Sequence, residues 1–184
     1  MLRVGPLSRL LAADQISTPL ANAELQAFRQ IPERQSSFYF HLARLIEILY
    51  AWEEIQRVLN LPDILSEHVR AYAEPNAFEG IGISEAPRGT LMHHYKIDKH
   101  GLITYVNLII ATGHNNLAMN AGVKQVAQRF VKGDRLTEGM LNRVEAVIRT
   151  FDPCLSCSTH AVGQMPLHVQ LLAPSGEVLD EIAR

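Results

Sequence analysis

The chain has 184 residues, 47% of them hydrophobic and 20% charged, with a formal net charge of −2. This length allows one sizeable hydrophobic core, and the composition is that of a globular protein. The small net charge gives no electrostatic reason to expect nucleic acid or an anionic membrane as a partner. Apolar stretches such as Leu102–Thr112 are too short to span a bilayer. No continuous apolar run with a cleavage site follows the start, so we expect a cytoplasmic location.

Helix signals dominate the first third of the chain. Residues 1–11 are apolar but interrupted by Gly5 and Pro6, which predicts an irregular lead-in. Thr18–Gln30 has Pro19 just inside its start, followed by good helix formers. Ser37–Asn60 predicts the strongest helix, because apolar residues recur at helical spacing beside a polar face. We expect this stripe in the core: Leu42, Leu45, Ile46, Leu49, Trp52, Ile55 and Leu59.

The middle of the chain favours strands. Phe78–Ile83 is rich in glycine. Thr90–Ile97 and Leu102–Ile110 are rich in β-branched and aromatic residues, and the residues between them, Asp98–Gly101, are typical of a turn. These two segments predict a hairpin.

A further helix and hairpin are predicted towards the end. Thr137–Thr150 predicts a helix capped by Thr137 and ended before Pro153, because the residue before a proline avoids the helical region. Leu167–Leu172 and Glu177–Leu179 predict a short hairpin. The buried stripe expected for the helix is Met140, Leu141, Val144, Val147 and Ile148.

Chemistry is concentrated in residues 152–160, which read Asp-Pro-Cys-Leu-Ser-Cys-Ser-Thr-His and contain the only 2 cysteines. Two thiols at this spacing contact one ion if the backbone between them turns, and thiolates favour nickel, zinc or iron. The spacing alone leaves open a structural zinc half-site or a dithiol redox pair. A zinc site needs a further ligand, for which His93, His94 and His114 are candidates.

The segment Phe151–His160 resembles the C-terminal metal-binding signature of nickel–iron hydrogenase large subunits. Leu2–Pro6, Gly82–Leu91 (an arginine-bearing loop in the family) and Ala111–Asn116 are similar to other family stretches, in the same order. The likeness covers essentially the whole chain and resembles the branch that reduces NAD(P) or a deazaflavin. It implies a mainly helical α+β fold, a helical bundle with small β-hairpins, as the C-terminal part of the large subunit.

The resemblance also implies a metal centre. In the family, nickel is bound by four cysteine thiolates, two of which bridge to an iron that carries cyanide and carbon monoxide. By that pattern Cys154 is a terminal nickel ligand and Cys157 a bridging one. His160 resembles a histidine that binds a structural magnesium or iron ion.

Three further residues match family positions around this centre. Arg88 matches the arginine whose guanidinium lies over the open side of the metal pair, and Pro87 lines the pocket of the diatomic ligands. Asp152 matches a carboxylate that would hold the guanidinium by a bidentate pair. Heterolytic cleavage of H2 needs a base, and the Cys154 thiolate, kept deprotonated by metal, is suited to that role beside a fixed cation. The plainer interpretations are an ordinary ion-paired Arg88, a turn residue at Asp152, and structural roles for the histidine pair His93-His94.

The chain departs from the family in two respects. It has 2 cysteines where the centre needs four, and the family's proton-relay glutamate belongs near the absent pair. We therefore expect it to be inactive alone. The alternatives are a truncated gene, a split subunit completed by another polypeptide that supplies the missing half, and a fragment of a longer reading frame. Residues 161–184 follow His160, where a maturation protease of the family removes an extension after nickel loading. We expect residues 1–160 to form the hydrogenase part and residues 161–184 the extension.

Two functions follow as alternatives. The first is part of a hydrogenase catalytic subunit that oxidises or evolves H2 and exchanges electrons with NAD(P) or a similar acceptor through an iron–sulfur small subunit. A maturation protease and a chaperone are expected as further partners. The second is a truncated, non-catalytic metal-binding (zinc) or interaction protein derived from that family. Helices that normally pack on the missing half would expose apolar faces, so we expect dependence on a partner.

Overall fold

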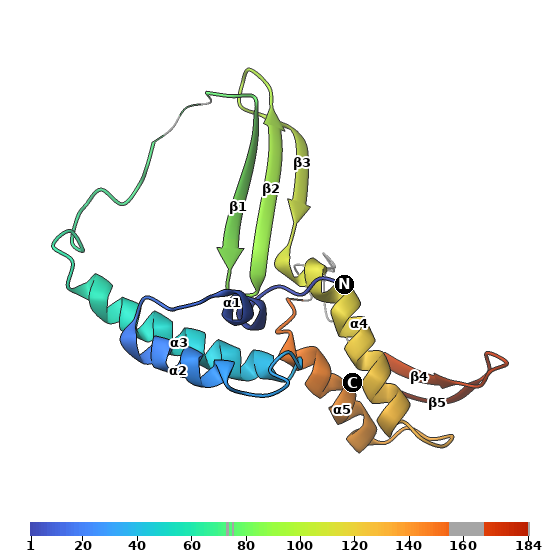
Figure 1. Ribbon diagram of the computed structural model, residues 1–184. Helices are drawn as coiled ribbons and strands as arrows, with labels where there is room; N and C mark the ends of the chain where they lie inside the picture. The colour runs from blue at the N-terminus through green and yellow to red at the C-terminus, as the bar shows by residue number, and fades with distance from the viewer. Residues whose placement is uncertain (73, 75, 155–167, 184) are drawn as a thin grey trace. The chain divides into compact units, whose positions relative to one another are not determined.

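The computed structural model describes residues 1–72, 74, 76–154 and 168–183. These residues form five α-helices and small antiparallel sheets, an α+β arrangement that confirms the predicted fold class (Figure 1). The chain divides into two compact units rather than one core. We call Val4–Ala111 the N-terminal unit, and Thr112–Arg184 together with Met1–Arg3 the C-terminal unit.

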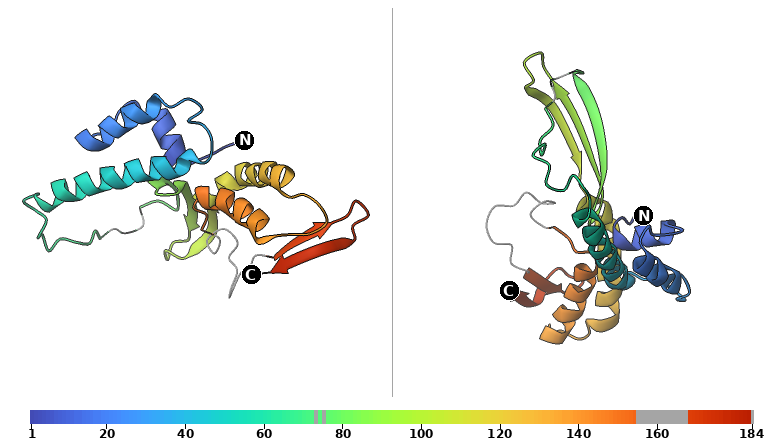
Figure 2. Two further views of the ribbon diagram at one scale, coloured as in Figure 1. Left: turned by 90° about the horizontal axis from the view of Figure 1, so that it is seen from below. Right: turned by 90° about the vertical axis from the view of Figure 1, so that its left-hand side faces the viewer.

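Three helices build the core of the N-terminal unit: α1 (Pro6–Ala12), α2 (Pro19–Arg29) and α3 (Tyr39–Leu59), with α1 and α2 both packed against α3 (Figures 1 and 2). The helices α2 and α3 confirm the sequence prediction. The helix α1 shows that the irregular lead-in was wrong, because Pro6 occupies the first helical position, where a missing N–H costs no hydrogen bond. The largest side chains buried in these helices are Leu7, Leu25, Phe28 and Phe40.

The predicted apolar stripe of α3 is largely not in the core, which corrects the sequence prediction. Only Ile46 of that stripe is fully buried, together with Phe40 and Ala43 on the same helix. Since α1 and α2 are packed against α3, they account for the buried face and leave the rest open. The exposed fractions along the open face are 62% for Leu45, 58% for Ile48, 62% for Trp52, 53% for Ile55 and 65% for Leu59.

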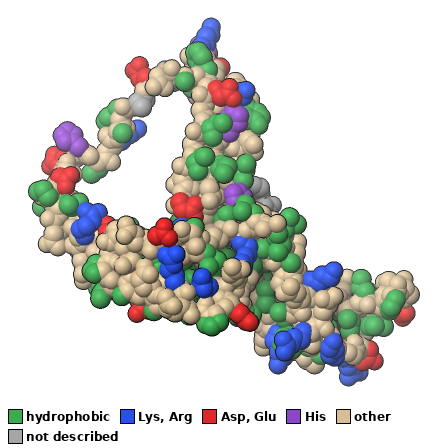
Figure 3. All heavy atoms as spheres, viewed as in Figure 1, with side chains coloured by type: hydrophobic (Ala, Val, Ile, Leu, Met, Phe, Trp, Pro, Cys, Tyr) green, Lys and Arg blue, Asp and Glu red, His purple; other side chains and the backbone are tan. Residues whose placement is uncertain are grey.

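A three-stranded antiparallel sheet completes the N-terminal unit, in the order β1 (Glu79–Ala86), β2 (Gly89–Ile97), β3 (Ile103–Ile109). The hairpin of β2 and β3 was predicted, and Asp98 Oδ1 accepts hydrogen bonds of 2.8 and 3.0 Å from two backbone N–H groups of its turn. Both outer strands expose apolar side chains, and hydrophobic atoms are visible along the sheet in Figure 3.

The C-terminal unit contains α4 (Ala111–Phe130, whose first residue belongs to the N-terminal unit), α5 (Glu138–Thr150), and the strands β4 (His168–Leu172) and β5 (Val178–Ala183). The helix α5 and the β4–β5 hairpin were predicted, whereas α4 was not. Thr137 caps α5 as expected, since its hydroxyl accepts a hydrogen bond from the Met140 N–H at 3.4 Å. The α5 stripe is fully buried at Leu141 and Val147 and half-buried at Met140, Val144 and Ile148. Among the described residues, no helix is long and apolar enough to cross a membrane.

Gly122 of α4 lies close to Val147 of α5 because glycine has no side chain. A Cβ atom added to Gly122 would lie 2.9 Å from Cγ1 of Val147, whereas one added to Gly113, on the same helix, would meet nothing within 4 Å. The two glycines therefore form a matched pair for measuring this contact.

Replacing either glycine by alanine should gain about 1 kcal/mol of helix propensity. We expect Gly113→Ala to stabilise the chain, and Gly122→Ala to be less stable than Gly113→Ala by about 1–3 kcal/mol because the new methyl group overpacks Val147. Urea unfolding followed by circular dichroism measures the difference. Equal free energies of unfolding for the two variants would contradict the close approach.

Candidate metal centre

The helix α5 leads directly into the cysteine segment. Phe151 keeps a helical backbone, and the Asp152 N–H donates to the Arg149 carbonyl at 3.1 Å. Asp152 then takes a φ of 50°, in the left-handed region. Aspartate tolerates that region better than most residues, and the following Pro153 disfavours a right-handed helical backbone at Asp152. The local sequence therefore ends α5 and turns the chain towards Cys154.

The first turn of α4 receives this segment. The Cys154 N–H donates to Oγ1 of Thr112 at 3.2 Å, and Thr112 is buried. Asn115, one turn further along α4, is also buried. Nδ1 of His114 is buried and has no hydrogen-bond partner among the described residues. The stretch Ala111–Asn116 therefore provides a largely buried support for the backbone at Cys154.

Of the three predicted metal ligands, Cys154 lies within the described residues. Cys157 and His160 lie outside them. Cys154 can bind a metal only as its thiolate. Residues 1–72, 74, 76–154 and 168–183 contain no group of three His, Cys, Asp or Glu side chains placed to hold a metal. The described chemistry thus fits a soft thiolate ligand set of which this chain supplies a part.

His93 and His94 have structural partners on the sheet. Nδ1 of His93 lies 3.1 Å from the Tyr95 hydroxyl, and Nε2 of His94 lies 2.8 Å from Oε1 of Glu79. His94 and Lys96, both close to Glu79, hold the pKa of that carboxyl below its ordinary value. These contacts support the structural interpretation of the histidine pair.

Arg88 lies in a tight turn. Ala86 pairs with Gly89 across the β1–β2 hairpin, so Pro87 and Arg88 form a two-residue connection, and the segment expected to be a loop is a hairpin. Both turn residues are exposed. Arg88 belongs to the N-terminal unit and Asp152 to the C-terminal unit, so their ion pair stays a prediction.

Two residues near these positions were not identified as site residues from the sequence. Thr112 lies within Ala111–Asn116, and the resemblance of this stretch to the family could have identified it as a site residue. Arg9 of α1 donates to the carbonyls of Ala86 and Pro87 at 3.0 and 2.8 Å. Arg9 gave no local signal because these partners are 77 and 78 residues away in the sequence.

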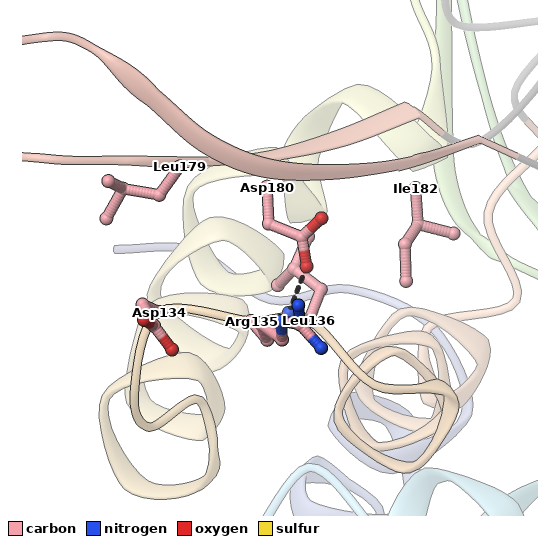
Figure 4. Close-up of a pocket in the computed structure, with 6 residues that line it drawn as sticks. All are labelled: Asp134, Arg135, Leu136, Leu179, Asp180 and Ile182. Carbon is pink, nitrogen blue, oxygen red and sulfur yellow. Dashed lines mark hydrogen bonds between the residues drawn. The ribbon is translucent and has the colours of Figure 1, made fainter.

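A pocket of about 500 Å³ lies elsewhere in the C-terminal unit (Figure 4). Asp180 Oδ2 accepts a hydrogen bond of 2.7 Å from the Leu136 N–H, which ties β5 to the segment before α5. The pocket contains none of the predicted site residues, so we assign it no part in the metal centre. Its lining residues are Asp134, Arg135, Leu136, Leu179, Asp180 and Ile182.

Comparison with known proteins bears on the whole chain. The profile of the nickel-dependent hydrogenase family matches residues 1–160. The NAD-reducing hydrogenase HoxS subunit beta of Cupriavidus necator is 45% identical over 189 residues, which cover 100% of this chain and 39% of that protein. The chain thus spans well under half the length of this relative.

Solved structures agree with this match. The crystal structure of an NAD+-reducing nickel–iron hydrogenase in the H2-reduced state has a TM-score of 0.79 at 44% identity, covering 86% of this chain and 36% of its own. The nickel–iron–selenium hydrogenase of Dm. baculatum has a TM-score of 0.58 at 24% identity over 86% of this chain and 34% of its own, which shows a shared fold. The resemblance inferred from the cysteine segment is confirmed: the chain belongs to the nickel-dependent hydrogenase family.

Proposed function

We propose that this chain supplies part of the nickel–iron centre of a hydrogenase that oxidises or evolves H2 and exchanges electrons with NAD(P) or a similar acceptor through an iron–sulfur subunit. The observation that carries the proposal is the family match over residues 1–160, which contains the cysteine segment. Its support in this chain is the turn at Asp152 and the part-buried hydrogen bond from Cys154 to Thr112.

In this proposal Cys154 and Cys157 would hold the nickel–iron pair, and His160 would hold a magnesium or iron ion. The metal pair with its cyanide and carbon monoxide ligands supplies the redox chemistry of H2 when it is bound. The Cys154 thiolate accepts the proton, because a metal-bound thiolate is deprotonated near neutral pH. Arg88 stabilises the separated charges, Asp152 holds the Arg88 guanidinium by a bidentate pair, and Pro87 contributes an apolar wall.

The remaining ligands come from outside these residues. Because 2 thiols leave the four-thiolate set incomplete, these residues are inactive alone, and a segment outside residues 1–184, on the same or another polypeptide, completes the set. Residues 161–184 are a C-terminal extension that a maturation protease removes, and a chaperone delivers the metal.

The open face of α3 is the site we propose for that completing polypeptide. Successive members of this face are separated by three or four residues, which is the spacing at which one helix packs along another. We call this face the seam. Every member is more than half exposed, and a contiguous apolar face of this kind marks an interaction site. The seam consists of Leu45, Ile48, Trp52, Ile55 and Leu59.

The first test is the metal content of the chain purified from its native host with any polypeptide that copurifies. We expect nickel and iron in near-equal amounts by mass spectrometry, together with a cysteine-bearing partner. Cys154→Ser should lose nearly all nickel, whereas the surface variant Lys132→Gln should keep it. Zinc alone, or no metal, would overturn the proposal and favour the truncated metal-binding or interaction protein.

Two substitutions of Asp152 distinguish a role of its backbone conformation from a role of its charge. Asp152→Asn keeps a residue that tolerates positive φ, so we expect its unfolding free energy to stay within about 0.5 kcal/mol of the wild type. Asp152→Ala should lose about 1 kcal/mol, because alanine resists the left-handed region. If the carboxylate holds Arg88, both variants should reduce H2 oxidation by the completed complex at least about tenfold. An Asn variant with wild-type activity would leave Asp152 a turn residue only.

The seam is tested by Trp52→Glu. Trp52 is 62% exposed, so the variant should leave the unfolding free energy of the chain nearly unchanged. Its affinity for the copurified partner should fall about 30-fold or more, since a buried tryptophan at an interface is commonly worth at least 2 kcal/mol. Leu117→Glu on α4 is the matched control, because Leu117 is 69% exposed and is not a member of the seam. Equal losses in the two variants would refute the seam, as would no loss at Trp52. Isothermal titration calorimetry measures the affinity of each variant for the partner.

A further inference from the structure

The Arg9 guanidinium uses its full hydrogen-bonding capacity, which is five N–H donors. Nε and Nη2 bind the two carboxylate oxygens of Glu47 on α3, each at 2.6 Å, and Nη1 binds Oε1 of Glu85 on β1 at 2.6 Å. The two remaining donors bind the carbonyls of Ala86 and Pro87. The Arg9 side chain is only 26% exposed. One side chain of α1 thus joins α3 to the end of β1 and to the turn.

The charges around Arg9 favour this arrangement. Burial acts to lower the pKa of Arg9, but hydrogen bonds and charges from Glu47 and Glu85 raise it above its ordinary value. The second oxygen of Glu85 accepts a hydrogen bond of 2.8 Å from the Thr90 hydroxyl on β2. Glu85 therefore links Arg9 to both strands that flank the turn.

The backbone on the other side of the turn is held by close packing. A Cβ atom on Gly5 would lie 2.8 Å from the Arg88 carbonyl oxygen, and one on Gly89 would lie 2.3 Å from Cγ2 of Val4. Gly89 also has a φ of 133°, which a larger residue would strain to adopt. The segment Val4-Gly5 therefore fits directly against Arg88 and Gly89, while Arg9 holds the preceding carbonyls.

From this geometry we propose that Arg9 is a positioning residue for Arg88: it fixes the backbone of the two-residue turn from which the Arg88 guanidinium extends. The anchoring concerns the N-terminal unit alone, whereas its catalytic consequence rests on the proposed function. Misplacing a catalytic group by about 1 Å can cost about 100-fold in rate. Lysine cannot replace Arg9, because an ammonium has three donors and lacks the planar fork that binds Glu47 and the carbonyls together.

Hydrogen exchange on the full chain tests the anchoring without any metal. In Arg9→Lys, amides of residues 85–91 should exchange about tenfold faster or more, the loss of roughly one or two hydrogen bonds in free energy. Amides of α2 and α5 should keep wild-type rates. The control is Arg29→Gln, since Arg29 binds the carbonyls of Ala13 and Asp14 and lies away from the turn. Unchanged exchange in residues 85–91, or faster exchange throughout the unit, would overturn the proposal.

A double-mutant cycle in the completed complex tests the link to Arg88. Arg9→Lys should lower kcat at least about tenfold at unchanged nickel content, and adding it to Arg88→Lys should cause little further loss, because residues that act through one another are not additive. Full additivity would mean that Arg9 acts independently of Arg88 and would overturn the inference. A wild-type complex without nickel would instead refute the proposed function, while the exchange measurement would still decide the anchoring.

Discussion

The ion cluster around Arg9 is the constraint on which the N-terminal unit depends. A small antiparallel sheet is marginally stable in water unless a hydrophobic face is covered, and the strands here expose large apolar side chains such as Ile81 at 68% and Ile103 at 62%. The β1–β2 turn is instead fastened to the helices by Arg9, Glu47 and Glu85. The rigidity of the turn that presents Arg88 therefore comes from directional hydrogen bonds on one side and from the close packing of Val4 and Gly5 on the other.

In the C-terminal unit, the cysteine segment is positioned by backbone contacts rather than by an ion cluster. Its reactive segment starts at a backbone reversal, where Asp152 accepts a left-handed conformation and Thr112 binds the Cys154 N–H. Both constraints act on the main chain and need no charge. The turn itself requires only a residue that tolerates positive φ, so the conformation at residue 152 does not depend on a carboxylate.

The sequence predicted what depends on near neighbours. Spacing and capping predicted α2, α3 and α5, and residue type predicted the β2–β3 hairpin. The helix α1 was missed because Gly5 and Pro6 were treated as interruptions, although proline is favourable at a first helical position. The helix α4 was missed because glycines and asparagines crowd its first turns. The spacing in α3 located an apolar stripe but not its neighbours, and Arg9 depends on Glu47 and Glu85, 38 and 76 residues away. The cysteine spacing alone indicated either a metal site or a redox site. Only the family resemblance favoured the metal site over the redox site.

Two kinds of incompleteness point to the same missing component. The thiolate set of the proposed centre is incomplete with 2 cysteines, and the seam of α3 is incomplete because its apolar residues are exposed. A metal that binds only the assembled ligand set stabilises the assembly by its own binding free energy, since mass action favours whichever state binds the ligand. Under the proposed function, the segment that covers the seam also carries the second pair of thiolates. Metal loading and covering of the seam are then one coupled equilibrium, and weakening the seam should weaken nickel retention even though no seam residue is a proposed metal ligand.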